Sequence, residues 1–294
     1  MAKKKNKSIL PVAFIIAILI IAVAIIVVLA KGYRFTTYDD GSRFIGSVQS
    51  GQPISGKIKY SNGMTAIIDY TNKKIEYSNG DVYVGDISVI YRDGKGVLTY
   101  GGTKDVYEGD FKNDKIDGMG KYTYADGSVF EGSFSGGEKN GYGTFISQSG
   151  EITKGNYVGN LLNGFGEYTS ADGKYTYSGN FINDVQNGYG KCTYSNGDTY
   201  EGEFVNNQRH GYGTYTWANG ATYTGGYIRD LRDTRILDED GNYKLDEKGN
   251  YVHGQMATHT YDSGKIYTGY FESGYIAVVD KESSTENDAS DTEE

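Results

Sequence analysis

A Gly-x-Gly motif that returns about every 23 residues constrains the fold of this chain more than any other feature. Its regular copies begin at Gly118, Gly141, Gly164, Gly188 and Gly211, at spacings of 23, 23, 24 and 23 residues. A fixed period of this length is typical of one supersecondary unit stacked on copies of itself. The period therefore predicts a repeat array, and it favours binding and spacing over catalysis.

Each unit is predicted to be a β-hairpin. Asp126-Gly127 is a dipeptide that favours the positive φ angles of a tight turn. Large residues alternate on both sides of it, with Tyr122 before the turn and Phe130 and Phe134 after it. Alternation with a period of two and many aromatic residues indicates strands.

Glycines between the aromatic positions are expected to let a neighbouring ring or backbone come close. Gly202, between Tyr200 and Phe204, is one example. The aromatic and glycine positions predicted to form the repeat core are Tyr107, Gly109, Phe111, Phe130, Gly132, Phe134, Gly141, Gly143, Gly164, Gly166, Gly188, Gly190, Tyr200, Gly202, Phe204, Gly211, Gly213, Tyr267, Gly269 and Phe271.

The repeats are predicted to extend over 32–275. They are degenerate over 32–93, regular over 94–233, interrupted by an insert at 234–253 and completed by a last unit at 254–275. One hairpin alone is marginal in water, so each unit must bury its aromatic face against its neighbours. The expected fold class is all-β: an elongated antiparallel β-hairpin array, preceded by one transmembrane α-helix.

The units resemble the MORN (membrane occupation and recognition nexus) repeat. In that motif an aromatic residue, a glycine two residues later and a second aromatic residue lead to a Gly-x-Gly. The segment 200–213 carries this pattern, from Tyr200-Glu201-Gly202-Glu203-Phe204 to Gly211-Tyr212-Gly213. Tryptophan, frequent at the second aromatic position of the family, is absent there. The resemblance implies a MORN-type solenoid. It supplies no activity, because such arrays occur beside catalytic domains in some lipid kinases and lysine methyltransferases and as membrane-linked scaffolds elsewhere.

The segment 9–30 contains 22 residues without a charge. A helix of that length spans about 33 Å, enough for the hydrocarbon core of a bilayer. It is therefore predicted to be an uncleaved signal-anchor; a cleaved signal peptide is the alternative, although 28–30 is a poor cleavage site. Its anchoring side chains are taken to be Ile9, Phe14, Ile20, Ile26 and Leu29.

Flanking charges predict the orientation of this segment. Residues 1–8 carry Lys3, Lys4, Lys5 and Lys7, more positive charge than follows the segment, and the more basic side stays in the cytoplasm. The expected location is thus the cell membrane, as a single-pass protein with a cytoplasmic N-terminus and extracytoplasmic repeats.

The charge distribution makes nucleic acid an unsuitable partner. The net charge is −9, and because the first 34 residues carry +6, the remainder carries −15. Such an acidic body would be repelled by phosphates. Residues 280–294 hold seven acids and no aromatic residue, which predicts a disordered acidic tail.

Sites for chemistry are few in this sequence. Cys192, the single cysteine, stands where other units have an aromatic residue, which favours a small core residue over a nucleophile. The insert repeats Asp-Glu-x-Gly-Asn-Tyr, but numbered as an EF-hand loop from Asp238 it has Tyr243 at the sixth position and Gly249 at the twelfth. These residues do not fit that calcium loop, and we assign no metal, cofactor or catalytic residue.

Three functions follow as hypotheses. The first is a non-enzymatic, membrane-tethered scaffold that presents an extended surface to a protein partner. The second is a module that stacks exposed tyrosines on a cell-wall or surface polysaccharide. The third, less favoured, is a hydrolase using paired carboxylates such as Asp238 and Asp240.

Overall fold

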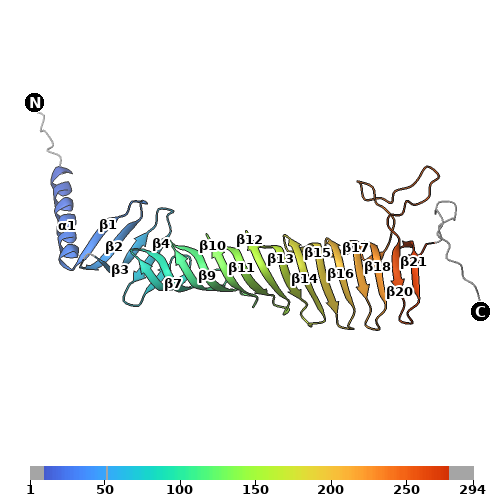
Figure 1. The fold of residues 1–294 in the computed structure, drawn as a ribbon. Helices are drawn as coiled ribbons and strands as arrows, with labels where there is room; N and C mark the ends of the chain where they lie inside the picture. The colour runs from blue at the N-terminus through green and yellow to red at the C-terminus, as the bar shows by residue number, and fades with distance from the viewer. Residues whose placement is uncertain (1–9, 51, 278–294) are drawn as a thin grey trace, which may run out of the picture. The chain divides into compact units, whose positions relative to one another are not determined.

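In the described part of the chain, one helix is followed by antiparallel strands (Figure 1). In the computed structural model, residues 10–50 and 52–277 are described. The chain divides into two compact units, 1–138 and 139–294. The predicted all-β array of antiparallel hairpins is confirmed.

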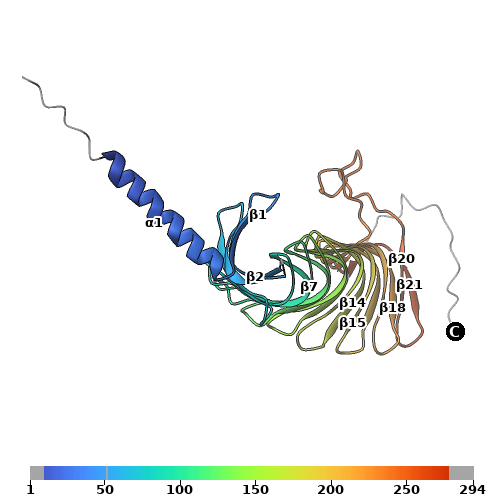
Figure 2. The same cartoon turned by 90° about the vertical axis from the view of Figure 1, so that its left-hand side faces the viewer.

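Helix α1 (Leu10–Ala30) opens the first unit (Figure 2). The helix ends where Gly32 takes a φ of 82°, a conformation that favours glycine after a helix. The predicted anchor side chains of Phe14, Ile20, Ile26 and Leu29 are exposed on α1. Ile9, the four lysines at 3, 4, 5 and 7 and the tail 280–294 lie outside the described residues.

The membrane prediction requires correction. Over 10–50 and 52–277, no helix combines the length and the apolar character that crossing a bilayer demands. The expected transmembrane helix is not found among these described residues, and the predicted single-pass location at the cell membrane is wrong.

In the first unit, each strand pairs antiparallel with the next one along the chain. The strands are β1 (Tyr33–Thr37), β2 (Arg43–Gln49), β3 (Gln52–Lys59), β4 (Thr65–Asp69), β5 (Lys74–Tyr77), β6 (Val82–Ser88), β7 (Tyr91–Thr99), β8 (Val106–Lys112), β9 (Lys115–Thr123) and β10 (Val129–Ser135).

The second unit continues the same pattern from β11 to β18. Its strands are β11 (Glu138–Ile146), β12 (Ile152–Val158), β13 (Leu161–Thr169), β14 (Tyr175–Ile182), β15 (Val185–Tyr194), β16 (Thr199–Val205), β17 (Gln208–Thr216), β18 (Thr222–Ile228), β19 (Leu231–Arg232), β20 (Ala257–Thr260), β21 (Ile266–Gly269), β22 (Phe271–Glu272) and β23 (Tyr275–Ile276). Strand β18 pairs with both β19 and β20, so the sheet resumes after the insert.

Two kinds of turn alternate along the second unit. The longer turn contains the expected Gly at positive φ, as at Gly197 (φ 89°). The shorter turn has two residues, both at positive φ, as at Asn206 (51°) and Asn207 (64°). This is the type I′ geometry that matches the twist of paired strands.

The core lies on one face of the strands in each unit. Tyr200 is fully buried, and its ring packs edge-on against Phe204 with centroids 5.2 Å apart. Its hydroxyl donates to the carbonyl of Glu203 at 3.0 Å, which satisfies the polar end of a buried ring. The same bond, from a tyrosine to the residue three positions later, is made by Tyr83, Tyr107, Tyr177 and Tyr223.

The insert forms two small bridged loops between β19 and β20. Leu237 bridges Tyr243, and Leu245 bridges Tyr251. The carboxylate of Asp238 accepts hydrogen bonds from the backbone of Asp240 and Asn242, so it stabilises a turn.

Candidate functional site

The Gly-x-Gly motif has two structural roles in each repeat. The first glycine, Gly211 in the motif 211–213, adopts a φ of 62° at a bulge where three residues face one on the neighbouring strand. The second, Gly213, faces the core, where a Cβ would lie 2.3 Å from the Tyr200 hydroxyl oxygen. Both positions therefore exclude side chains, and the residue between them points away from the core.

That middle residue is a large exposed ring on four strands of the second unit. The four side chains are Tyr142, Phe165, Tyr189 and Tyr212, which are 65%, 65%, 56% and 41% exposed. They lie on β11, β13, β15 and β17, one on every second strand. With strands about 4.8 Å apart, the rings follow one another at about 10 Å. We call these four residues the aromatic row.

A row of charged side chains runs beside the aromatic row on the same face. Glu167 on β13 and Lys191 on β15 stand two positions after the exposed ring, where β11 and β17 have Thr144 and Thr214. Charges of opposite sign face each other here: Lys154 lies opposite Glu167, and Lys191 lies opposite Glu201 with a 3.5 Å ion pair. Because these opposite charges compensate one another, the exposed rings are the more distinctive feature of this face.

Polar side chains at the two-residue turns connect each hairpin to the preceding one. Asn207 Oδ1 accepts from the backbone N–H of Gln186 at 2.8 Å, and Asp230 Oδ1 accepts from that of Arg209 at 3.0 Å. Arg209 also lies over the rings of Tyr200, Tyr215 and Tyr227, 5.4–5.7 Å from their centroids. These acids and amides have structural partners, which explains their frequency on the repeats.

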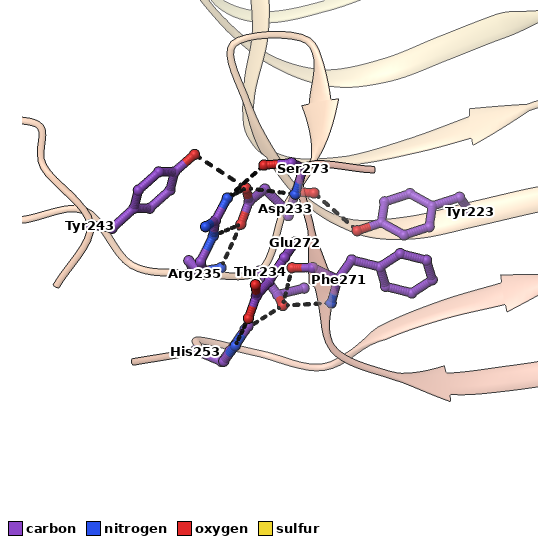
Figure 3. A network of polar contacts seen from close by, with 10 residues as sticks. Tyr223, Asp233, Thr234, Arg235, Tyr243, His253, Phe271, Glu272 and Ser273 are labelled. Carbon is purple, nitrogen blue, oxygen red and sulfur yellow. Dashed lines mark hydrogen bonds and ion pairs between the residues drawn. The ribbon is translucent and has the colours of Figure 1, made fainter. Parts of the chain in front are cut away.

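The base of the insert is held by a buried ion pair (Figure 3). Arg235 Nη2 lies 2.5 Å from Asp233 Oδ2, with the two side chains 6% and 0% exposed. The Arg235 guanidinium also lies over the ring of Tyr243, 3.6 Å from its centroid. Burial acts to raise the pKa of Asp233, but hydrogen bonds from Arg235 and Ser273 outweigh it and hold this pKa below its usual value.

A histidine lies beside the ion pair. His253 Nδ1 is 2.9 Å from the Thr234 hydroxyl, and Nε2 is 3.2 Å from Glu272 Oε1. Figure 3 shows this group next to Asp233 and Arg235. No group of three or more metal-ligating side chains is found within the described part of the chain.

The residues predicted for the repeat core fall into three groups in the structure. Tyr107, Phe111, Phe130, Phe134, Tyr200, Phe204 and Phe271 are buried, and Tyr267 is half-buried. The core-facing glycines Gly132, Gly143, Gly166, Gly190, Gly202, Gly213 and Gly269 are buried, and Gly109 is half-buried. The bulge glycines Gly141, Gly164, Gly188 and Gly211 are half-buried or exposed.

Cys192 is confirmed as a core residue. It is 1% exposed, and burial raises the pKa of its thiol. Asp238 and Asp240 lie in the turn described above, where the carboxylate of Asp238 is used by backbone N–H groups.

The reasoning from sequence alone missed the individual members of the aromatic row. Their signal was present, since each stands between two glycines of a repeated motif. Because the second glycine faces the core and successive side chains of a strand point to opposite faces, the middle side chain lies on the opposite face of the strand. The turn residues 160, 184, 207 and 230 were also missed, although they recur with the period of the repeats, at spacings of 24, 23 and 23 residues.

Comparison with known families agrees with this geometry. The MORN repeat model matches residues 107–129, 130–152, 154–175, 177–199 and 200–222. The chain contains five MORN repeats. The aromatic row lies within these MORN repeats, at the bulge between consecutive hairpins. No curated protein matches the chain.

Similar solved structures include the wild-type TCP10 domain of CPAP from Danio rerio. It is 16% identical over 66% of this chain and 94% of that chain, with a TM-score of 0.36. The same domain in complex with a peptide of Danio rerio STIL is 13% identical over 82% of this chain and 95% of that chain, with a TM-score of 0.30. At TM-scores this low, the similarity says nothing about what the present chain binds.

Proposed function

We propose that this chain is a non-enzymatic scaffold whose MORN repeats bind a protein partner through the aromatic row. The observation that carries the proposal is the exposure of Tyr142, Phe165, Tyr189 and Tyr212 on one face. The repeat core is complete without them, because the opposite face holds the buried rings. Large exposed rings flanked by glycine are accessible from both sides, and aromatic residues supply much of the energy at protein interfaces.

The arrangement fits a partner that contacts several repeats at once. Rings at about 10 Å intervals extend over seven consecutive strands, β11 to β17, so no single repeat contains the whole surface. The compensated charges beside the row give a polar border of the kind that surrounds an apolar interface centre.

The test compares two matched quadruple variants of the full chain. One changes the aromatic row to serine at 142, 165, 189 and 212. The other changes four charged residues of the neighbouring row to serine: Lys154, Glu167, Lys191 and Glu201. Partners captured by the wild-type chain are identified, and their affinities are measured by interferometry with each variant. We expect the aromatic variant to lose at least about tenfold in affinity and the charge variant far less, because buried aromatic anchors dominate binding.

Two results would contradict the proposal. Equal affinity for the wild-type chain and the aromatic variant would show that binding uses another surface. Sedimentation of the wild-type chain with insoluble polysaccharide, lost in the aromatic variant while no protein partner binds, would assign the row to sugar rings. Unfolding curves of both variants establish that the repeats remain folded.

A further inference from the structure

A second surface, in the first unit, forms a groove of about 930 Å³ across strands β1 to β5. Two rows of side chains bound it on the sheet face opposite the buried core. One row is Phe35, Ile45, Lys57, Ile67 and Glu76, and the other is Thr37, Arg43, Lys59, Thr65 and Ser78. Buried residues such as Phe44 and Ile58 lie between the rows and direct their side chains to the core.

The groove is cationic, although the net charge of the chain is −9. Arg43 lies directly opposite Lys59, and Lys57 is two residues from Lys59 on the same face. Within 10–50 and 52–277, the cations of Arg43, Lys57 and Lys59 have no ion pair with an acid. The one acid in the groove, Glu76, pairs with Lys74 at 2.5 Å.

This charge pattern departs from that of the repeats. On the corresponding face of β8 to β10, Lys121 lies opposite Glu108 on one side and Glu131 on the other. Like charges directly opposite each other destabilise a sheet, whereas opposite charges stabilise it. The Arg43–Lys59 pair thus carries a cost to folding that a bound anion would remove.

Apolar side chains are exposed in the same groove. Phe35, Ile45 and Ile67 are 58%, 39% and 51% exposed and belong to one wall. The opposite wall holds Arg43 and Lys59 between threonines. The groove therefore offers one side that is mainly apolar, with Lys57 between Ile45 and Ile67, and one side that is cationic.

We infer that this groove binds an extended segment of a protein in which acidic and apolar residues alternate. Successive side chains of an extended segment point to opposite sides. Its apolar residues would contact Phe35, Ile45 and Ile67, while its carboxylates would pair with Arg43 and Lys59. Five strands span about 19 Å, the length of about six extended residues. Several carboxylates match three cations better than the single charge of a fatty acid does.

The experiment uses the full chain and a fluorescein-labelled peptide, Glu-Leu-Asp-Leu-Glu-Phe-Asp, followed by fluorescence anisotropy. A Lys-Leu-Lys-Leu-Lys-Phe-Lys peptide tests the charge, and Glu-Gly-Asp-Gly-Glu-Gly-Asp tests the apolar contacts. We expect saturable binding of the first peptide alone, weakening as salt is raised because charged groups contribute.

Matched variants locate the binding. Arg43→Glu with Lys59→Glu should weaken binding at least about tenfold, since it replaces two attractions by two repulsions. The control is Lys112→Glu with Lys115→Glu, a second pair of lysines that face each other across strands but lie outside the groove. The control should change the affinity less than about twofold, because Lys112 and Lys115 lie outside the groove and solvent and salt screen their charges from the bound peptide. Ile45→Ser with Ile67→Ser should also weaken binding while leaving its salt dependence intact.

Three outcomes would overturn the inference. One is no saturable binding of the acidic peptide. Another is an equal loss in the Arg43/Lys59 and Lys112/Lys115 variants, which would indicate attraction by net charge alone. The third is binding of decanoate, blocked by Arg43→Glu with Lys59→Glu, in the absence of peptide binding, which would assign the groove to an anionic amphiphile.

Discussion

The side chain of Asp184 accepts a hydrogen bond from the backbone N–H of Leu162, 22 residues earlier, at 2.7 Å. The backbone N–H of Asp184 donates in turn to the carbonyl of Leu162 at 3.0 Å. Asp184 is the second residue of a two-residue turn, at a φ of 68°. One turn residue therefore binds both backbone groups of a residue in the preceding hairpin. The same pair of hydrogen bonds is made by Asn160, Asn207 and Asp230.

This pair of hydrogen bonds predicts different effects for two substitutions at position 184. Asp184→Ala removes the acceptor for the backbone N–H of the buried Leu162 and should destabilise the chain by about 1–3 kcal/mol. Asp184→Asn keeps an acceptor oxygen, as Asn160 and Asn207 do in the same position, and should cost less than about 0.5 kcal/mol. Urea unfolding of the full chain measures both. A loss for Asp184→Asn as large as that for Asp184→Ala would mean that the negative charge matters and not the hydrogen bond.

The core-facing glycines predict a second, position-dependent loss of stability. A Cβ on Gly202 would lie 2.5 Å from Gly213 Cα and 2.5 Å from the Tyr200 hydroxyl oxygen. Gly202→Ala should therefore overpack the core and cost about 1–3 kcal/mol. Gly102 is the matched control, because its φ is not positive and no atom lies within 4 Å of a Cβ placed there. Similar melting temperatures for Gly202→Ala and Gly102→Ala would contradict this packing.

The fold could be predicted from the sequence where a position accepts only one type of residue. The Gly-x-Gly motif predicted stacked hairpins because both positions require glycine. The first adopts a positive φ, and the backbone of the second is in contact with a buried tyrosine ring. The sequence could not assign Arg209 its place over three rings, because other repeats have Leu162 or Gln186 there, and only tertiary contacts distinguish these roles. Arg43 facing Lys59 was equally hidden, since it depends on strand register in the degenerate units.

Asp198 predicts how stability changes with pH. The Tyr215 hydroxyl donates to Asp198 Oδ2 at 2.5 Å, and Ala218 N–H donates to Oδ1 at 2.9 Å. The hydrogen bond from Tyr215 is the main cause that lowers the pKa of Asp198 in the folded chain. An aspartate whose folded pKa is depressed stabilises the fold above its unfolded pKa of about 3.9, and this contribution is lost as the pH falls through the folded pKa.

Stability curves between pH 6 and pH 3 measure this contribution. Asp198→Asn cannot titrate, so its free energy of unfolding should fall less steeply below about pH 4 than that of the wild-type chain. Asp240→Asn is the control; it changes an exposed acid whose carboxylate accepts no hydrogen bond within residues 10–50 and 52–277. Parallel curves for the wild-type chain and Asp198→Asn would exclude a role for this carboxylate.

The ion pair between Asp233 and Arg235 predicts local loosening of the insert. Arg235→Ala would leave the Asp233 carboxylate buried without its cation, a change that costs about 3–5 kcal/mol in buried pairs. It would also remove the guanidinium between the rings of Tyr243 and Tyr251, 3.6 Å and 4.7 Å from their centroids. Limited proteolysis should then cut between 236 and 252 faster than in the wild-type chain, while Lys244→Ala, an exposed change in the same insert, should leave the rate unaltered. An unchanged cleavage rate in Arg235→Ala would show that the bridges Leu237–Tyr243 and Leu245–Tyr251 hold the insert without this cation.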